Sequence, residues 1–167
     1  MKLLLMRHAH TEQSPEKQDF ERILTDQGQA EAMEAANFLN SYRIDKMIVS
    51  YVKRTLQTAN IIEEQIPISE NEVVKELYNG TRENMIELLS NQEDTNKHIL
   101  VIGHNPLIYT LALEISGSDL EEFEFLSNSS MPPARIIVID FPSINSWKEL
   151  KNHKGKIAEI FTPSTSS

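Results

Sequence analysis

Short unbroken apolar runs alternate along the chain with longer stretches in which apolar residues recur at helical spacing. Residues 3–6 and 99–102 contain only Leu, Met, Ile and Val. Runs this short are typical of strands buried on both faces, as in the middle of an α/β sheet. Other segments with strand character are residues 44–49, 71–77, 134–141 and 156–161, and the last two could pair across a turn.

The segments between these strands predict helices. Ala32, Ala35, Ala36 and Leu39 recur at helical spacing, and Thr25 is a suitable N-cap. Further helices are expected over residues 52–65 and 81–89, and from an N-cap at Asn105 with Pro106 in the first turn, to about residue 115. This alternation predicts a three-layer α/β/α sandwich with a mainly parallel central sheet.

The 167 residues suit one domain, which we place at residues 1–161, with a frayed tail at 162–167. Residues 11–20 are polar and predict a loop over the end of the first strand. Residues 119–133 are acidic and then rich in Ser and Pro, which predicts a surface excursion with Glu121, Glu122 and Glu124 on a solvated face.

Composition excludes several classes of protein. The formal charge of −9 argues against a nucleic-acid partner, although a local cluster of Arg can still bind phosphate. The chain has no Cys, which excludes disulfides, thiolate catalysis and Cys-based metal sites. Only four apolar residues follow Lys2, so we expect neither a signal peptide nor a membrane partner, and a cytoplasmic location.

Three polar groups follow predicted strands: Arg7-His8, Ser50 to Arg54, and His104-Asn105. In open α/β sheets, chemistry takes place beyond the carboxyl ends of the strands. Arg grips phosphate oxygens in a bidentate manner, and an imidazole can attack phosphorus and hold the phosphoryl group covalently. These residue types at these places predict phosphoryl transfer.

Four ordered motifs resemble those of the histidine phosphatase superfamily, which is also called phosphoglycerate mutase-like. They are Leu5-Met-Arg-His-Ala9, Leu24-Thr25-x-x-Gly28, Ser50-Tyr-Val-Lys-Arg-Thr-Leu-Gln-Thr-Ala59 and Val101-Ile-Gly-His-Asn-Pro106. The resemblance covers about residues 2–140, and the short chain is most similar to the SixA-type phosphohistidine phosphatases.

The resemblance implies that His8 is the nucleophile and that Arg7, Arg54 and His104 complete a phosphate pocket. Water would then hydrolyse the phosphohistidine intermediate. The family mechanism implies no metal ion and no organic cofactor. The spacing His8-x-His10 could suggest a metal pair, but no third ligand has convincing spacing.

The chain departs from the family pattern in three places. Ala9 stands where Gly is commoner, and Tyr51 stands where Pro is frequent. Asn105 occupies the position of the Asp that serves as general acid in the acid phosphatase branch. The Gly-x-Trp-Glu context of the mutase branch is absent; Glu76 and Glu83 lie in the right region, but their spacing does not single them out.

A missing general acid favours phosphohistidine as substrate, because a leaving imidazole can already carry a proton whereas an alkoxide needs one. The partner would be a phosphorylated protein. One alternative is a phosphatase of small phosphorylated molecules with Glu76 or Glu83 as acid; another is a phosphate-binding module without turnover.

Three further residues have two interpretations each. Thr11 and Asn105 could each donate to phosphate or only satisfy the backbone at a loop end. Arg22 could bind substrate or solvent. The oligomeric state stays open.

Overall fold

The computed structural model describes residues 1–116 and 131–164. Within them, one sheet has the strand order β3-β2-β4-β1-β5-β6. The strands are β1 (Lys2–Arg7), β2 (Lys46–Ser50), β3 (Glu70–Val74), β4 (His98–Gly103), β5 (Ile136–Asp140) and β6 (Lys156–Phe161). Strands β1 to β4 are parallel to one another. At one side of the sheet, β5 pairs antiparallel with β1, and β6 pairs antiparallel with β5. The predicted α/β fold with a mainly parallel sheet is confirmed.

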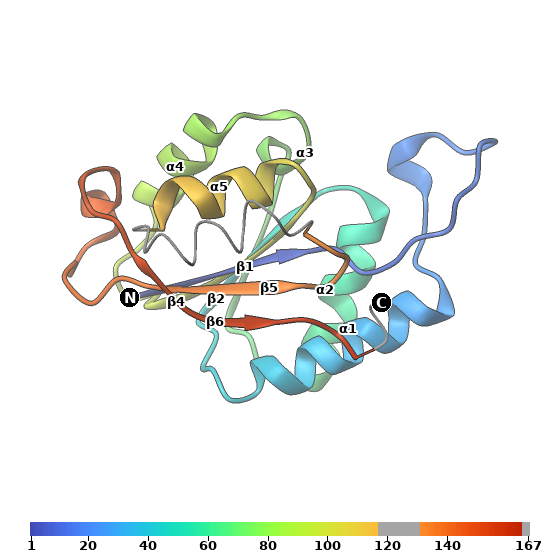
Figure 1. Cartoon of the computed structure of the whole chain (residues 1–167), viewed down its shortest axis with the longest axis horizontal. Coiled ribbons are helices and arrows are strands. Elements are labelled where there is room, and N and C mark those ends of the chain that lie inside the picture. Colours follow the sequence, from blue (N-terminus) through green and yellow to red (C-terminus); the bar gives the residue numbers. More distant parts are fainter. Residues whose placement is uncertain (117–130, 165–167) are drawn as a thin grey trace.

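Helices cover both faces of the sheet (Figure 1). The helices are α1 (Asp26–Leu39), α2 (Lys53–Gln65), α3 (Glu76–Asn79), α4 (Arg82–Ser90) and α5 (Leu107–Ile115), with the short 3-10 helices η1 (Asp19–Glu21) and η2 (Trp147–Asn152). Helices α1 and α2 lie on one face, and α3, α4 and α5 lie on the other.

The unbroken apolar run of β1 is explained by these two layers. Leu3 and Leu5 pack with residues of α4 and α5, whereas Leu4 and Met6 pack with residues of α1 and α2. All four side chains are fully buried. Because successive side chains of a strand point to opposite faces, a strand between two helical layers must be apolar at every position.

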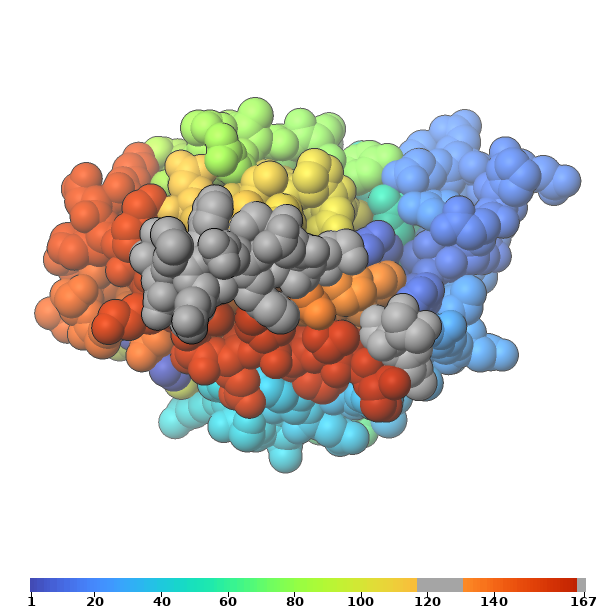
Figure 2. All heavy atoms as spheres, in the orientation of Figure 1, coloured from blue at the N-terminus to red at the C-terminus, as the bar shows by residue number. Residues whose placement is uncertain are grey.

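The parallel strands end at one edge of the sheet, on the right of Figure 1. Arg7 at the end of β1 lies in register with Gly103 of β4, and Val49 of β2 lies in register with Ile102. The segment after β1, which includes η1, projects beyond the rest of the molecule at this edge (Figure 2). The sheet therefore brings the polar residues that follow β1, β2 and β4 together.

Some predicted boundaries are wrong. Pro106, not Asn105, is the N-cap of α5, because the Asn105 side chain donates instead to the backbone oxygen of Met131, at 2.9 Å. Strand β3 ends at Val74 rather than at residue 77, and α3 follows it. Strand β5 begins at Ile136, since Ala134 adopts φ = 62° and leaves the extended conformation.

The predicted tail contains contacts at its start. The backbone N–H and the hydroxyl of Ser164 donate to the Glu34 carboxylate at 2.9 and 2.8 Å. Residues 165–167 lie outside the described residues, as does most of the predicted excursion at 119–133, including Glu121, Glu122 and Glu124. In residues 1–116 and 131–164, no helix is both long and apolar enough to cross a membrane.

Candidate active site

Arg7, His8, Arg54 and His104 come together at the edge where the parallel strands end. Arg7 is the last residue of β1, Arg54 lies in the first turn of α2, and His104 directly follows β4. The rings of His8 and His104 are 5.4 Å apart between centroids, at an angle of 55°. His8, Arg54 and His104 are only 5, 4 and 7% exposed. The structure thus joins four residues that are up to 97 positions apart (104 − 7 = 97).

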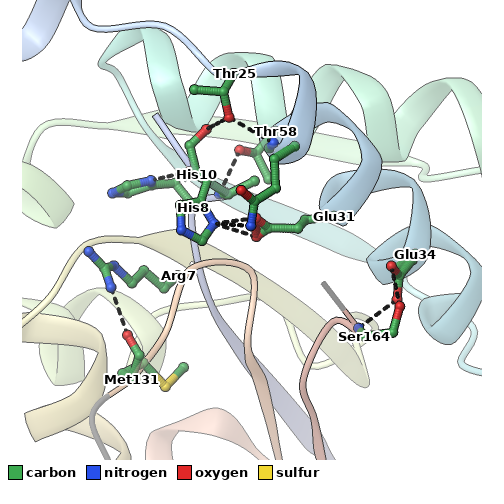
Figure 3. A network of polar contacts seen from close by, with 12 residues as sticks. Arg7, His8, His10, Thr25, Glu31, Glu34, Thr58, Met131 and Ser164 are labelled. Atoms are coloured by element: carbon green, nitrogen blue, oxygen red, sulfur yellow. Dashed lines mark hydrogen bonds and ion pairs between the residues drawn. The ribbon is translucent and has the colours of Figure 1, made fainter. Parts of the chain in front are cut away.

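Helix α2 holds the segment that follows His8. The Thr58 hydroxyl accepts a hydrogen bond from the backbone N–H of Ala9 at 3.2 Å, and donates to the backbone oxygen of Arg54 at 2.8 Å (Figure 3). The Gln57 side-chain oxygen accepts from the N–H of Leu24 at 2.8 Å. The Gln-Thr pair of the third motif therefore connects the first and second motifs.

The second motif, Leu24-Thr25-x-x-Gly28, brings the start of α1 close to the segment that follows His8. The Thr25 hydroxyl accepts from the N–H of Gly28 at 3.0 Å and caps α1, as predicted. The N–H of Thr25 donates to the backbone oxygen of His10 at 3.1 Å. A Cβ atom on Gly28 would lie 2.1 Å from that oxygen. Glycine is required here because no side chain fits between the two backbones.

One hydrogen bond determines which nitrogen of His8 is free. Its Nδ1 lies 2.7 Å from the backbone oxygen of Ala9. A carbonyl oxygen only accepts, so Nδ1 carries the proton and Nε2 keeps its lone pair. Burial lowers the pKa of His8 well below its usual value, and the nearby His104 and Arg7 lower it further. At neutral pH the ring is therefore uncharged, with Nε2 able to attack an electrophile.

His104 is held by a hydrogen bond to the Ser50 hydroxyl. Its Nε2 lies 2.7 Å from the Ser50 hydroxyl. Burial first, and then the charge of Arg54, lower the pKa of His104 to about 3, so the ring is neutral. Its Nδ1 is buried and has no hydrogen-bond partner among the described residues. If the Ser50 hydroxyl donates to Nε2, Nδ1 carries the proton and can donate to an anion.

The guanidinium groups are each held at one end. A terminal nitrogen of Arg7 donates to the backbone oxygen of Met131 at 2.8 Å (Figure 3). Arg54 donates to the backbone oxygen and to Oδ2 of Asp19, at 2.7 and 2.9 Å. Within the described part of the chain, the buried Nε atoms of Arg7, Arg54 and Arg22 have no partner. Buried donors are normally paired, so these atoms mark a place for an anion.

The electrostatics agree with an anion site. Burial lowers the pKa of Arg7, and the positive charges of Arg54 and Arg22 lower it further. Such mutual repulsion between cations in a desolvated pocket is relieved when an anion binds. A tetrahedral oxyanion offers several acceptor oxygens and suits the diverging donors of these side chains.

Asp19 and Tyr78 were not identified from the sequence, which left Arg22 open between substrate and solvent. Arg22 lies 3.1 Å from Oδ1 of Asp19, and Asp19 also accepts a hydrogen bond from the Tyr78 hydroxyl at 2.7 Å. Asp19 and Arg22 belong to the polar segment after β1, where no periodicity indicates a direction for a side chain. The available signal was their position just before the Leu24-Thr25 motif.

The remaining predicted site residues are Thr11, Asn105, Glu76 and Glu83. Thr11 pairs with Leu24 as an isolated β-bridge. The Asn105 amide donates to the backbone oxygen of Met131, which agrees with the interpretation that this side chain satisfies the backbone. Glu76 and Glu83 are exposed. Glu83 borders a surface cavity of about 320 Å³ beside α4, and its own backbone N–H and then Thr81 lower its pKa. A lowered pKa is opposite to what a general acid requires.

His10 contacts a buried carboxylate. Its Nδ1 contacts both oxygens of Glu31, a fully buried residue of α1 (Figure 3). Burial raises the pKa of Glu31, although His10 opposes this effect. Among the described residues, no three His, Asp or Glu side chains are grouped so that they could hold a metal ion.

Known structures share this fold. A SixA structure from Nakamurella multipartitia superposes with a TM-score of 0.84 at 21% identity, covering 98% of this chain and 96% of that one. The protein histidine phosphatase SixA in complex with tungstate gives 0.79 at 22% identity, covering 98% and 97%. A mycobacterial glucosyl-3-phosphoglycerate phosphatase gives 0.67 at 13% identity, covering 94% and 96%. Among curated proteins, no sequence matches the chain.

A family model decides the assignment. The model of the histidine phosphatase superfamily (branch 1) matches residues 3–94, more than half of the chain. This range contains the first three motifs, whose residues meet around His8. The chain belongs to the histidine phosphatase superfamily, branch 1.

Proposed function

We propose that this phosphatase hydrolyses phosphohistidine on a protein, without a metal ion, through a phosphoryl group held on His8. The observation that carries the proposal is the pocket itself. A neutral imidazole with a free Nε2 lies in one cluster with Arg7, Arg54 and His104, and each of these three carries a buried donor without a partner among the described residues. This combination of nucleophile and anion donors suits transfer of a phosphoryl group and little else.

In the first step, the lone pair of His8 Nε2 attacks phosphorus. The bond from phosphorus to the leaving nitrogen breaks, and its electron pair stays on that nitrogen. Arg7, Arg54 and His104 donate to the non-bridging oxygens, where charge is spread in the transition state. In the second step, water attacks phosphorus, the P–Nε2 bond breaks, and its electron pair returns to His8. Inorganic phosphate leaves.

The choice of a P–N substrate rests on the carboxylate that contacts this pocket. The Tyr78 hydroxyl, and then Arg54, lower the pKa of Asp19, so this carboxylate is ionised at neutral pH. An ionised carboxylate cannot donate a proton to an alkoxide leaving group. The imidazole of phosphohistidine can carry a proton on its other nitrogen and leaves as a neutral ring. Such a substrate needs no acid from the enzyme.

The absence of a metal ion from the proposed mechanism rests on charge. Arg7 and Arg54 supply two fixed positive charges, and Arg22 supplies a third. These groups can neutralise a transferring phosphoryl group as a divalent cation does in other enzymes. We therefore expect full activity after dialysis against a chelator.

The similar structures are compatible with this proposal. The fold is shared with SixA, a protein histidine phosphatase that was solved with tungstate, a tetrahedral oxyanion. It is also shared with a phosphatase of glucosyl-3-phosphoglycerate, so the fold admits small molecules too. The discrimination between phosphohistidine and a phosphate ester therefore needs an experiment.

The test is an acid-quench trap at neutral pH. The protein is mixed with labelled phosphoramidate or with a labelled phosphomonoester, and the phosphorylated residue is located by mass spectrometry. We expect label on His8, formed faster from phosphoramidate. If label on His8 forms faster from the ester, His8 is still the nucleophile, but the substrates are small phosphate esters rather than phosphohistidine.

Two variants serve as controls for the trap. His8→Ala should abolish labelling, whereas His153→Ala, at an exposed position, should label like the unmodified protein. If no variant and no substrate gives label, while orthophosphate still binds, the protein is a phosphate-binding module and the proposed activity is wrong.

A further inference from the structure

Three aromatic rings extend from the buried pocket to the surface. The His104 ring contacts the Tyr78 ring edge-on, with centroids 5.4 Å apart. Tyr78 in turn contacts Tyr51 at 5.8 Å and an angle of 76°. His104 is 7% exposed and Tyr51 is 39% exposed. We call Tyr51 and Tyr78 the aromatic shelf; their rings meet edge to face, and the Tyr78 ring also contacts His104.

The inner part of this shelf is held in place. The Tyr78 hydroxyl donates to Oδ2 of Asp19 at 2.7 Å, and the Arg54 guanidinium lies 5.9 Å from the centre of the Tyr78 ring. Tyr51 directly follows Ser50, whose hydroxyl contacts His104. The position of Tyr51 is therefore tied to the pocket through its neighbour Ser50, while Tyr51 itself is 39% exposed.

The outer residue of the shelf, Tyr51, is 39% exposed. The exposed part of its ring gains nothing by burial in the folded protein, so packing alone does not account for an aromatic side chain here. A partly exposed ring next to the phosphate-binding residues is instead placed to contact the group that carries the phosphate.

The direction of the reaction indicates which part of the substrate reaches the shelf. In-line displacement places the leaving group opposite the attacking nitrogen. His8 is only 5% exposed, and a phosphohistidine on another protein must approach from solvent, so the leaving group lies on the solvent side of His8. Tyr51 is 39% exposed and continues the line of ring contacts that runs from His104 through Tyr78.

We propose that Tyr51, together with Tyr78, forms a specificity subsite that stacks the imidazole ring of the phosphohistidine substrate. The inference rests on the proposed phosphohistidine activity and names the group that confers selectivity. A planar imidazole stacks on an aromatic face, and a protonated ring adds a cation–π attraction. When the P–N bond breaks, its electron pair stays on the substrate nitrogen, and the neutral ring leaves along the shelf. An aliphatic phosphate ester has no ring to stack.

The experiment compares two substrates that share a P–N bond and differ in the ring. We would measure kcat/KM for a phosphohistidine peptide and for phosphoramidate, and take their ratio. Tyr51→Ala should lower this ratio about 3- to 10-fold, the range expected for one aromatic contact. Tyr51→Phe keeps the ring and should retain the ratio. Leu56→Ala, at an equally exposed apolar position of α2, is the matched control and should also retain it.

The outcomes separate the two proposals. If Tyr51→Ala lowers kcat/KM equally for both substrates, or for neither, Tyr51 does not discriminate for the imidazole ring of the substrate, and this inference is overturned. If the unmodified protein hydrolyses phosphate esters but not the phosphohistidine peptide, the proposed function fails, and the subsite for imidazole fails with it. A Tyr51→Phe variant as poor as Tyr51→Ala would assign the effect to the hydroxyl and also contradict stacking.

Discussion

At the scale of single residues, the pocket depends on hydrogen bonds that assign protons to ring nitrogens. The backbone oxygen of Ala9 places the proton of His8 on Nδ1 and leaves Nε2 free. When the Ser50 hydroxyl donates to Nε2 of His104, the proton of this ring lies on Nδ1, which is then free to donate to an anion. Both rings are buried and neutral, so their chemistry depends on tautomer rather than on charge.

Removal of the Ser50 hydroxyl tests this role. We expect Ser50→Ala to lower kcat/KM for phosphoramidate about 10-fold, the effect of losing one buried hydrogen bond. Steady-state kinetics would measure it. Ser90→Ala is the matched control, because the Ser90 hydroxyl is also buried but bonds to the backbone oxygen of Ile86, inside α4. Equal losses in both variants would mean that the effect is only structural.

Arg22 has two interpretations, binding of substrate or of solvent, that an experiment can separate. Its buried Nε is unpartnered among the described residues, and its positive charge lowers the pKa of Arg7. We expect Arg22→Ala to raise the inhibition constant of tungstate or orthophosphate about 10-fold, because one charge-assisted hydrogen bond to the anion is lost. Arg43→Ala serves as control. An unchanged inhibition constant for Arg22→Ala would show that Arg22 does not bind the anion.

At the scale of elements, each sequence motif joins two parts of the fold. The motif in α2 holds the segment after β1 through Thr58, and the motif at the start of α1 holds it through Thr25. The third contact is the close approach of Gly28 to the backbone of His10. The segment that contains His8 is therefore held by the start of α1 and by α2 as well as by its own strand.

Gly28→Ala tests the closest of these contacts. The new Cβ would lie 2.1 Å from the backbone oxygen of His10, so α1 or the segment after β1 must move. We expect the free energy of unfolding to fall by about 1–3 kcal/mol, as for other overpacked sites, and kcat to fall with it. Denaturant unfolding would measure the first quantity. Gln29→Ala, at an exposed position of the same helix, should leave both nearly unchanged.

The element boundaries show which signals were reliable. The β4 boundaries at His98 and Gly103 agree with the apolar run, since burial between two layers leaves no room for polar side chains. The start of α5 was wrong because the Asn105 amide had a better acceptor in Met131, 26 residues away. N-cap propensity describes local competition for hydrogen bonds, and a distant partner can outcompete it.

At the scale of the whole molecule, the buried histidines make stability depend on pH. The pKa of His104 is lowered to about 3 in the folded protein, against about 6.5 in an unfolded chain. The unfolded state therefore binds more protons below pH 6.5, and acidification favours it. His8, whose pKa is also lowered well below its usual value, acts in the same direction.

We expect the free energy of unfolding to fall as pH drops from 6.5 to about 4.5, by up to about 1.4 kcal/mol per pH unit for each of these histidines. Chemical unfolding at several pH values would measure the slope. His104→Gln removes one of the two groups and should give a shallower slope, whereas His153→Gln should not change it. A slope that His104→Gln leaves intact would contradict the lowered pKa.

The amino-acid sequence by itself determined the α/β class, the strand–helix order and the four motif residues Arg7, His8, Arg54 and His104, because burial on two faces and strand-end chemistry leave local signatures. Only the tertiary structure decided that Asp19, Arg22, Tyr51 and Tyr78 lie beside these four residues. Their side chains come from segments without periodicity or from different elements. Which donors stay unpartnered, and which ring nitrogen stays free, depends on contacts across the fold. No local pattern encodes such contacts.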